Sequence, residues 1–338
     1  WRIADMTTKH FTANVISASK VVPDGNFETS AASGVWDLSE QYDLRKGGNW
    51  PITGNAAPFA MVAGTEYEQR ILISTLGNAV NWGETLTRRS PVQSCGSSTR
   101  AVFAGGYYGD GASDIIEYNL FATSGSGADF GDLAYAKATQ GAGFGNNTRG
   151  IFAGGQGDPR DSIQYITIAT TGNAQVFGDL SSEDFSSGSG AFASTTRGII
   201  AESGNSNNIR MDYVTIGSTG NGQDFGDLTG ETDRDDFAGA SNSTRGLFGG
   251  GWTGSGSPFN IIDYVTIANT GNTTDFGNLS VSRRMLGASA SSTRALFHGG
   301  VSSTATIDYV EIATTGNAVD FGDLSRASYQ HAGTSNSH

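Results

Sequence analysis

The sequence predicts an all-β protein assembled from a repeated sheet. Its 338 residues include 49 Gly and only 6 Pro. Short runs of β-branched and aromatic residues alternate with stretches of Gly, Ser and Asn, which is typical of strands joined by turns. Long runs with the 3.6-residue spacing of an amphipathic helix are scarce. An internal repeat then indicates how these strands are arranged.

The repeat shows most clearly as two marker positions, mostly aromatic, that lie twelve residues apart. The six pairs are Arg70/Trp82, Tyr118/Phe130, Tyr165/Phe177, Tyr213/Phe225, Tyr264/Phe276 and Tyr309/Phe321. A further marker, Thr-Arg followed by an apolar run, precedes five pairs, with its arginine at Arg100, Arg149, Arg197, Arg245 and Arg294. The repeat is about 48 residues long, which suits one blade of a β-propeller.

Each unit is predicted to contain four short strands. The first is a small-residue run such as 285–291, the second is the apolar run after Thr-Arg, and the third and fourth contain the two markers of the pair. Thr-Gly-Asn, which suits a tight hairpin with positive φ, recurs between the last two strands at 171–173, 219–221, 270–272 and 315–317. The third strand is apolar at nearly every position, so we expect a sheet covered on both sides, as a blade is by its neighbours.

The first unit lacks a first strand of its own. Residues 58–64, 70–75 and 81–86 match the second, third and fourth strands, whereas the tail 325–338 aligns with a first strand. We therefore predict a six-bladed β-propeller over 55–338 that is closed by its C-terminal strand, which leaves no open sheet edge. Residues 1–54 contain no repeat and are expected to form an N-terminal arm or small docking domain, with Trp36 and Trp50 as candidate assembly anchors.

Charge and composition exclude several classes of function. The formal net charge of −13 is unlike the basic surface that binds nucleic acid, so we expect no nucleic-acid partner. No run approaches the roughly 18 consecutive apolar residues of a membrane span, so no membrane insertion is expected. The single Cys95 excludes an intramolecular disulfide.

The triplet Asp-Phe-Gly, which binds magnesium in protein kinases, occurs four times, beginning at Asp129, Asp224, Asp275 and Asp320. A kinase needs one such Asp together with a Gly-rich loop, a strand Lys and a catalytic-loop Asp, and these do not occur in order. Four copies therefore predict a structural element at the end of each blade.

The sequence supports no other group of catalytic or metal-binding residues. The histidines, His10, His298, His331 and His338, are not at chelating spacing, and the acidic run 229–237 does not follow the EF-hand pattern. Cys95 lies in a small-residue strand, where a buried thiol is expected. We expect no enzyme activity, no catalytic residue, no metal and no cofactor.

The five Thr-Arg arginines allow two hypotheses. They could form a ring that binds an anion, or each guanidinium could make the same hydrogen bonds within or between blades. The second hypothesis is favoured, because a fork of donors suits carboxylate and carbonyl oxygens.

The candidate binding surface follows from the loop lengths. The interval from the Thr-Arg arginine to the third-strand Tyr varies between 15 and 19 residues, whereas the hairpin spacing is constant. The variable loops open on one face of a propeller, and loops carry recognition on a fixed scaffold. The candidate ligand-binding residues, which suit stacking on sugars and bonding to hydroxyls, are Tyr107, Tyr108, Asp110, Trp252 and Phe259. Alternatively, these aromatic residues pack locally or against another subunit.

The order of Gly-Gly, Tyr, a second aromatic residue, Leu and often Arg resembles the kelch-type β-propellers. The resemblance covers residues 55–338, with the kelch Trp mostly replaced by Phe and retained at Trp82. The phrases at 212–228 and 263–279 look like repeats in structural proteins of tailed, especially marine, bacteriophages. Residues 30–51 look like a segment of phage tail and virion proteins.

This resemblance implies a non-enzymatic virion structural protein, a tail fibre or tail-associated protein on the exterior of an extracellular particle. It would be oligomeric in the particle, and its partners would be other virion subunits and a host cell-surface polysaccharide. The alternatives are a capsid decoration or head fibre protein, and a cellular kelch-like adhesin or glycan-active propeller enzyme.

Overall fold

The chain divides into two units, Trp1–Gly54 and Asn55–His338. The computed structural model describes residues 58–336 except 64–67, 91, 109–110, 139–140, 183–186, 204–208, 229–233, 254–255 and 302–304. In the first unit it describes two short antiparallel strands, β1 (Lys20–Val21) and β2 (Phe27–Glu28). No helix occurs among the described residues.

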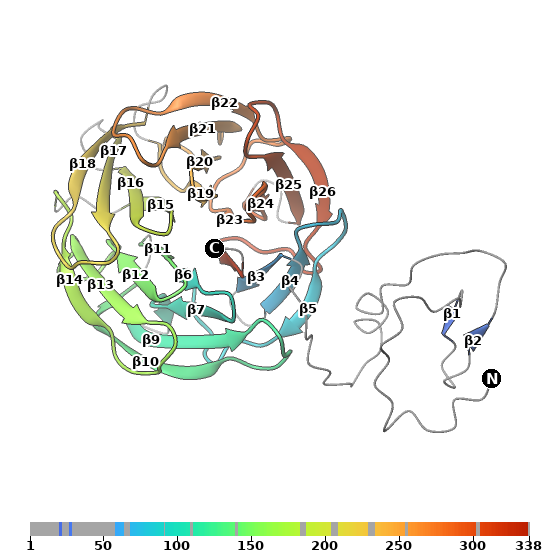
Figure 1. The fold of residues 1–338 in the computed structure, drawn as a ribbon, viewed down its shortest axis with the longest axis horizontal. Coiled ribbons are helices and arrows are strands. Elements are labelled where there is room, and N and C mark those ends of the chain that lie inside the picture. The colour runs from blue at the N-terminus through green and yellow to red at the C-terminus, as the bar shows by residue number, and fades with distance from the viewer. Residues whose placement is uncertain are drawn as a thin grey trace. The chain divides into compact units, whose positions relative to one another are not determined.

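The second unit is a ring of six antiparallel sheets, which we number as blades 1 to 6 (Figure 1). Blade 1 contains β27 (Ala332–Ser335), β3 (Phe59–Ala63), β4 (Glu68–Leu72) and β5 (Val80–Gly83). Blade 2 contains β6 (Gln93–Gly96), β7 (Arg100–Ala104), β9 (Gly111–Leu120) and β10 (Ala128–Lys137), with the short β8 (Tyr107–Tyr108) paired to β9. Blade 3 contains β11 (Ala142–Gly145), β12 (Arg149–Ala153), β13 (Ser162–Thr167) and β14 (Gln175–Asp179).

The remaining blades repeat this order. Blade 4 contains β15 (Ser187–Ala193), β16 (Arg197–Ser203), β17 (Ile209–Thr215) and β18 (Gln223–Asp227). Blade 5 contains β19 (Ala238–Ser241), β20 (Arg245–Gly249), β21 (Ile261–Thr266) and β22 (Thr274–Asn278). Blade 6 contains β23 (Gly287–Ala290), β24 (Arg294–His298), β25 (Thr306–Glu311) and β26 (Val319–Asp323). The first strand of each blade lies nearest the centre of the ring and the fourth at its perimeter (Figure 1).

The C-terminal strand closes the ring. β27 pairs antiparallel with β3, so that Ala332 lies opposite Ala63 and Ser335 opposite Ala60. The predicted six-bladed propeller with its C-terminal closure is therefore confirmed. In blade 1 the third strand begins at Glu68, two residues before the start that the repeat predicts.

The hydrophobic core consists of six clusters, one at each seam between neighbouring blades. The cluster between blades 5 and 6, for example, joins Leu247 and Phe276 of one blade to Leu286 and Val310 of the next. Equivalent clusters fill the other five seams. Because every blade is covered on both faces, no blade has a complete core of its own.

The Asp-Phe-Gly triplet forms a β-bulge in the fourth strand. In blade 5, Asp263 lies opposite Asp275 and Ile262 opposite Gly277, so Phe276 is the extra residue on its strand. The ring of Phe276 is buried and meets that of Tyr264 edge-on, with centroids 5.9 Å apart. The constant twelve-residue spacing of the repeat therefore reflects an aromatic pair packed between blades.

The segment at the bulge is bonded to the next blade by what we call the interblade clasp. In blade 4, the oxygen of Phe225 accepts from the nitrogen of Gly271 (2.7 Å), and that of Asp227 accepts from Thr273 (3.0 Å). The turn residue Asn272 then accepts from the nitrogen of Asp227 through Oδ1 at 3.0 Å. The backbone donor/acceptor pairs at the other seams are Gly125/Trp82, Gly127/Glu84, Gly172/Phe130, Ala174/Asp132, Gly220/Phe177, Gly222/Asp179, Gly316/Phe276, Ala318/Asn278, Gly77/Phe321 and Ala79/Asp323.

The glycine of the triplet is required by this clasp. Gly226 has φ of 140°, a conformation that side chains rarely adopt. A Cβ atom on Gly226 would lie 2.5 Å from backbone atoms of Gly271. Both the backbone conformation and the space between blades therefore exclude a side chain here.

The expectation that the third strand is apolar at nearly every position is wrong at one position. The residue before the first marker of each pair is polar and buried in all six blades, namely Gln69, Glu117, Gln164, Asp212, Asp263 and Asp308. Asp308 shows its use, because its Oδ2 accepts from the nitrogen of Ser280 (3.1 Å) and its Oδ1 from the Ser280 hydroxyl (2.6 Å). Asp308 thus binds the segment that leaves the preceding blade, and these hydrogen bonds satisfy the buried oxygens of its carboxylate.

Candidate functional site

The two faces of the ring differ in the connections that they carry. In an antiparallel four-stranded blade, the turns after the first and third strands lie at one end. The connections after the second and fourth strands lie at the other. We call these ends the hairpin face and the loop face. On the loop face, Asp235 forms an isolated β-bridge to Trp252, which joins a connection between blades to a loop within a blade.

The repeated arginines lie at the hairpin face and join neighbouring blades. The Cζ atom of Arg197 lies 4.4 Å from the ring centroid of Tyr213 in its own blade. Its Nη1 donates to the oxygens of Ile267 (3.0 Å) and Ala268 (2.9 Å) in the next blade. The other four arginines make the same two contacts. Each stacks on the tyrosine of its own blade, in the pairs Arg100/Tyr118, Arg149/Tyr165, Arg245/Tyr264 and Arg294/Tyr309. Each also donates to backbone oxygens of the next blade, which are those of Ile168 for Arg100, Ile216 for Arg149, Ile312 and Ala313 for Arg245, and Ile73 and Ser74 for Arg294. The interblade hydrogen bonds expected of these arginines are present.

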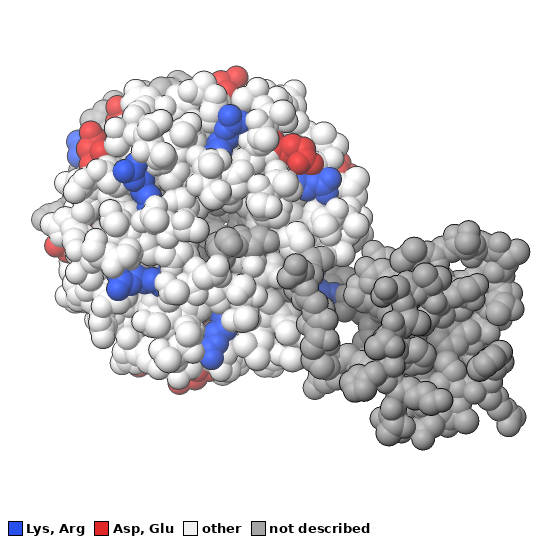
Figure 2. Space-filling view, viewed as in Figure 1, with Lys and Arg blue, Asp and Glu red and all other residues white. Residues whose placement is uncertain are grey.

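The charges on one face of the molecule are separated from one another. Figure 2 shows Lys and Arg side chains spaced singly around the ring, with Asp and Glu mostly toward its perimeter. Neutral surface separates each visible cation from the next, and Arg294 is paired with the carboxylate of Glu311 at 2.8 Å. This face therefore presents separate cations rather than a continuous basic patch.

A second set of arginines, which the sequence reasoning missed, is buried under the loop face. Arg283 donates to the oxygens of Phe297 (3.0 Å) and Thr306 (2.8 Å) and forms an ion pair with Asp308 at 2.8 Å. Arg89 and Arg234 occupy the equivalent places and pair with Glu117 and Asp263. Each of the three lies four residues before an innermost strand, and this spacing was a signal available in the sequence. They anchor the connections between blades, so that the loop face has a rigid base.

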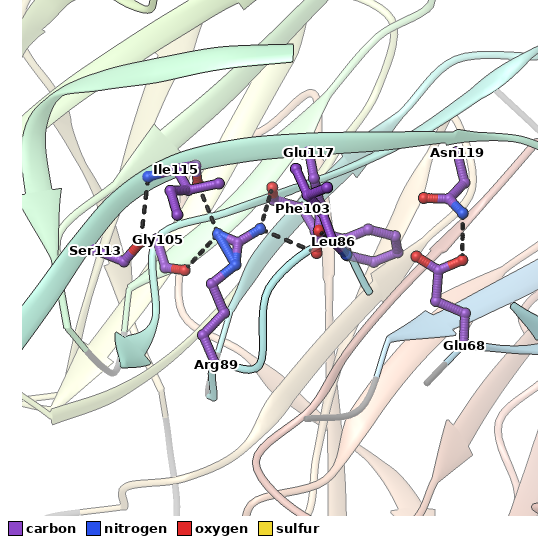
Figure 3. A network of polar contacts seen from close by, with 9 residues as sticks. All are labelled: Glu68, Leu86, Arg89, Phe103, Gly105, Ser113, Ile115, Glu117 and Asn119. Atoms are coloured by element: carbon purple, nitrogen blue, oxygen red, sulfur yellow. Dashed lines mark hydrogen bonds and ion pairs between the residues drawn. The ribbon is translucent and has the colours of Figure 1, made fainter. Parts of the chain in front are cut away.

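The Glu117 pair belongs to a wider network between blades 1 and 2 (Figure 3). Glu68 of β4 accepts a hydrogen bond from Nδ2 of Asn119 in β9. Glu117 is also in β9, and its side chain lies between those of Asn119 and Arg89 (Figure 3). Burial, together with the charge of Glu117, raises the pKa of Glu68 to about 9. Glu68 is fully buried, so this carboxyl is a neutral structural group at neutral pH.

The six innermost strands begin around a pocket on the axis of the loop face, which we call the axial mouth. Its cavity volume is 130 Å³, and its wall is made mostly of Gly and Ala from all six blades. The polar side chains in its wall are those of Gln93, Ser94, Asp236, Gln330 and His331. The axial mouth is thus a narrow, mainly uncharged site at the point where every blade converges.

A histidine pair lies beside the axial mouth. Nδ1 of His298 in β24 lies 2.9 Å from Nε2 of His331, and the rings are stacked with centroids 5.1 Å apart. Burial lowers the pKa of His331 to about 4 and that of His298 well below its ordinary value. Both imidazoles are therefore neutral at pH 7. Spacing along the chain did not predict the pair, because ring closure brings its two members together.

The ring of Trp252 is joined to the axial mouth through two charged side chains. Arg284 stacks on it with Cζ 3.8 Å from the ring centroid, and Nε1 of Trp252 donates to the oxygen of Gly256 at 3.1 Å. Arg284 also pairs with Asp236, at 3.6 Å, and Asp236 lines the axial mouth. Trp252 therefore packs locally, as the alternative hypothesis predicted, on the face of its ring that Arg284 covers.

The sequence-predicted ligand residues are not brought together. Tyr107 is exposed in blade 2, whereas Trp252 lies in blade 5, three blades away around the ring. Phe259 is half-buried, and its nitrogen donates to the oxygen of Gly251 at 2.8 Å. The side chains of Tyr108, Asp110, Trp36 and Trp50 lie outside the described residues. Trp252 adjoins the axial mouth through Arg284 and Asp236. Tyr107 is linked to the mouth through Ser90, which bonds to the backbone of Tyr107 and to the oxygen of Gln330.

Among the described residues, no group of three or more His, Cys, Asp and Glu side chains is placed to hold a metal ion. The same part of the chain has no helix of the length and apolarity needed to cross a membrane.

Comparison with known proteins adds no family to this description. No protein-family model matches the chain, and no curated protein matches it significantly.

Proposed function

We propose that the chain is a non-enzymatic, kelch-like propeller on the exterior of a tailed-phage particle, where its loop face attaches to a polysaccharide of the host surface. The observation that carries the proposal is the difference between the two faces. The arginines and turns of the hairpin face are used in bonds between blades, for example those of Arg197 and Asn272. The loop face carries the connections of unequal length and the axial mouth.

A rigid ring supports attachment in this way. The buried arginines Arg89, Arg234 and Arg283 each fix the end of a connection between blades, and a site that is fixed before binding loses less entropy when a ligand binds. Trp252 adds an aromatic surface next to the mouth, and sugars commonly stack on such rings. The kelch-like order of markers and the phrases at 212–228 and 263–279 support the virion part of the proposal. Residues 1–54 would dock the ring to other virion subunits.

Attachment is tested by presenting the purified protein to an array of bacterial surface polysaccharides. We expect binding to at least one polysaccharide, and weaker binding after Trp252→Ala. Val176→Ala, a truncation at an exposed site on the outer strand β14, is the matched control and is expected to bind as the wild type does. Absence of binding to every polysaccharide of the host would contradict the proposal.

Two further measurements separate the alternatives. The number of copies per particle, from quantitative mass spectrometry of purified virions, distinguishes a tail protein with few copies from a capsid decoration protein with many. Incubation of a bound polysaccharide with the protein should release no new reducing ends. Release of such ends would replace attachment with glycan hydrolysis.

A further inference from the structure

Three side chains at the axial mouth depart from the repeat. Gln93 begins its innermost strand, and at the same register position the other five blades have Ala or Gly, namely Ala332, Ala142, Gly190, Ala238 and Gly287. His298 lies on the second strand of blade 6, paired with Gly287 of the innermost strand, and the other five blades have Ala or Gly at this place in the second strand. His331 precedes β27, where blades 5 and 6 have Phe237 and Leu286. Positions that break the local pattern of a repeat are candidates for function.

These departures lie on consecutive blades, and two of them, His298 and His331, are in contact. His298, His331 and Gln93 belong to blades 6, 1 and 2, which are consecutive around the closed ring. Glycines on the adjoining strands leave room for them. A Cβ atom on Gly141 would lie 1.7 Å from Nε2 of Gln93, and one on Gly287 would lie 2.6 Å from Cε1 of His298. The space beside the mouth therefore matches these particular side chains.

Two polar atoms at the mouth lack a partner within the described part of the chain. They are Oε1 of Gln93 and Nδ1 of His331, although the two side chains are only 4% and 6% exposed. The other polar atoms of these side chains are used, because Nε2 of Gln93 donates to Gly154 and Nε2 of His331 meets His298. Leaving buried polar atoms unpaired is costly, so a ligand that offers a hydrogen-bond partner to either side chain would be favoured.

The mouth carries no net charge that would select an ion. The imidazoles are neutral at pH 7, because burial lowers the pKa of both. The nearest carboxylate, Asp236, is balanced by Arg284 at 3.6 Å. Oε1 of Gln93 only accepts a hydrogen bond, whereas Nδ1 of His331 accepts or donates according to the tautomer. Hydroxyl groups meet both requirements, since a hydroxyl donates and accepts.

The rim is held in shape before any ligand arrives. Asp236, Met285 and Gln330 have φ of 57°, 56° and 52°, although none of them is glycine. The nitrogen of Met285 donates to Asp236 (2.9 Å), and that of Gln330 donates to Met285 (3.0 Å). The Ser90 hydroxyl continues the chain to the oxygen of Gln330 at 2.6 Å. Strained residues fixed by a network of bonds are typical of functional sites.

Resting on the proposed function, we infer that the axial mouth binds one uncharged, hydroxyl-rich ring, such as the terminal sugar of a neutral glycan. Gln93 and His331 contact the ligand. His298 is a positioning residue, which orients His331 through the bond between the two rings. The 130 Å³ cavity admits a single ring or its edge rather than an extended chain. The rest of the glycan would leave across the rim toward Arg284 and Trp252.

Saturation-transfer NMR tests the site with the methyl glycosides of glucose, galactose, mannose and N-acetylglucosamine as probes. We expect at least one probe to bind the wild-type protein and to lose about tenfold in affinity in Gln93→Ala, the cost of one hydrogen bond. This variant carries the alanine that blades 1, 3 and 5 have at that position. Gln175→Ala, on the exposed strand β14, is the matched control and should bind unchanged.

A readout on the wild type keeps the test independent of folding defects. The ring ¹⁵N resonances of His331 should shift when the binding glycoside is added, and should not shift with sodium sulfate or magnesium chloride. The inference is overturned if no glycoside binds, if Gln93→Ala binds as tightly as the wild type, or if the ions shift these resonances instead. Polysaccharide binding that survives Gln93→Ala but not Trp252→Ala would overturn the axial site and leave the proposed function standing. Glycoside binding at the mouth without polysaccharide binding would support the site and overturn attachment.

Discussion

Nδ1 of His298 lies 2.9 Å from Nε2 of His331, across the seam at which the last blade meets the first. Burial lowers the pKa of His331 from 6.5 to about 4, so the folded state binds fewer protons than the unfolded state between these values. The stability that the pair contributes is complete above pH 6.5 and is lost as the pH falls toward 4. Neutral imidazoles are therefore a condition of ring closure.

The first prediction concerns this pH dependence. Between pH 7.5 and pH 5 the wild type should lose roughly 2 kcal/mol of unfolding free energy through His331 alone. In the variant His298→Ala/His331→Leu that loss should be absent. Urea unfolding of both proteins at the two pH values gives the change in unfolding free energy for each. Subtracting the change in the variant from that in the wild type removes the contribution of the other titrating groups. An equal pH dependence in the two proteins would contradict the prediction.

Glu68 is predicted to change stability with pH in the opposite direction to His331. Burial raises its pKa from 4.5 to about 9, so its contribution is present below pH 4.5 and is lost as the pH rises toward 9. Glu68→Gln needs no proton and should therefore be more stable than the wild type at pH 8, by roughly 5 kcal/mol, with no advantage at pH 4. Chemical unfolding at both pH values tests this.

The matched control for Glu68 is the carboxylate on the neighbouring blade. Glu117→Gln removes the partner of the buried Arg89 and should lower stability at both pH values. If Glu68→Gln is destabilising at pH 8, Glu68 is ionised in the folded protein and its assignment as a neutral group fails.

The interblade clasp is tested by two glycines of blade 4. Gly226→Ala forces a side chain into a positive-φ position 2.5 Å from Gly271 and should cost about 2–4 kcal/mol. Gly217→Ala, in the hairpin turn of the same blade, meets nothing within 4 Å and should cost less than about 1 kcal/mol. Thermal and urea unfolding give the two values. Equal effects would mean that the clasp does not limit the packing of blades.

The stacked arginines are predicted to act on stability rather than on binding. Arg197→Lys loses both the planar stack on Tyr213 and the fork of donors to the next blade, at a cost of about 1–2 kcal/mol. Arg210→Lys, at an exposed position of the same blade, should be neutral. Glycan binding should be the same in both variants. A variant that keeps its stability but loses an anionic ligand would restore the anion-ring hypothesis.

Removal of residues 326–338 should lower the melting temperature by about 10 °C or more. The deletion exposes the edge of β3 and leaves His298 without His331. Removal of 337–338 alone keeps β27 and should leave the melting temperature unchanged. Circular dichroism of the three proteins measures the effect, and a melting temperature equal to that of the whole chain would show that closure contributes nothing.

Much of the fold could be predicted because the repeat is local in sequence. The pair Tyr264 and Phe276 and the turn between them lie within one hairpin, so their spacing identified the strands. The buried Asp308 was missed, because a carboxylate looks out of place in an apolar strand until the segment it bonds from the preceding blade is known. Arg283 was missed for the same reason, since its partners belong to two other strands of blade 6.

The candidate site was predicted less well than the fold. Loop lengths pointed to the face that carries the axial mouth, and Trp252 adjoins that mouth through Arg284 and Asp236. Tyr107, however, lies three blades away from Trp252 around the ring. Sequence spacing does not predict which loops of a ring face one another. That depends on the number of blades and on the angle between them.

The sequence by itself determined the number of blades, the order of their strands and the exchange that closes the ring, because each of these follows from a repeated local pattern. Only the tertiary structure decided that Gln93, His298 and His331 meet at one mouth. They come from blades 2, 6 and 1, and the first and last blades become neighbours only when β27 pairs with β3. Contacts of this kind are set by the curvature of the whole ring, which no single repeat contains.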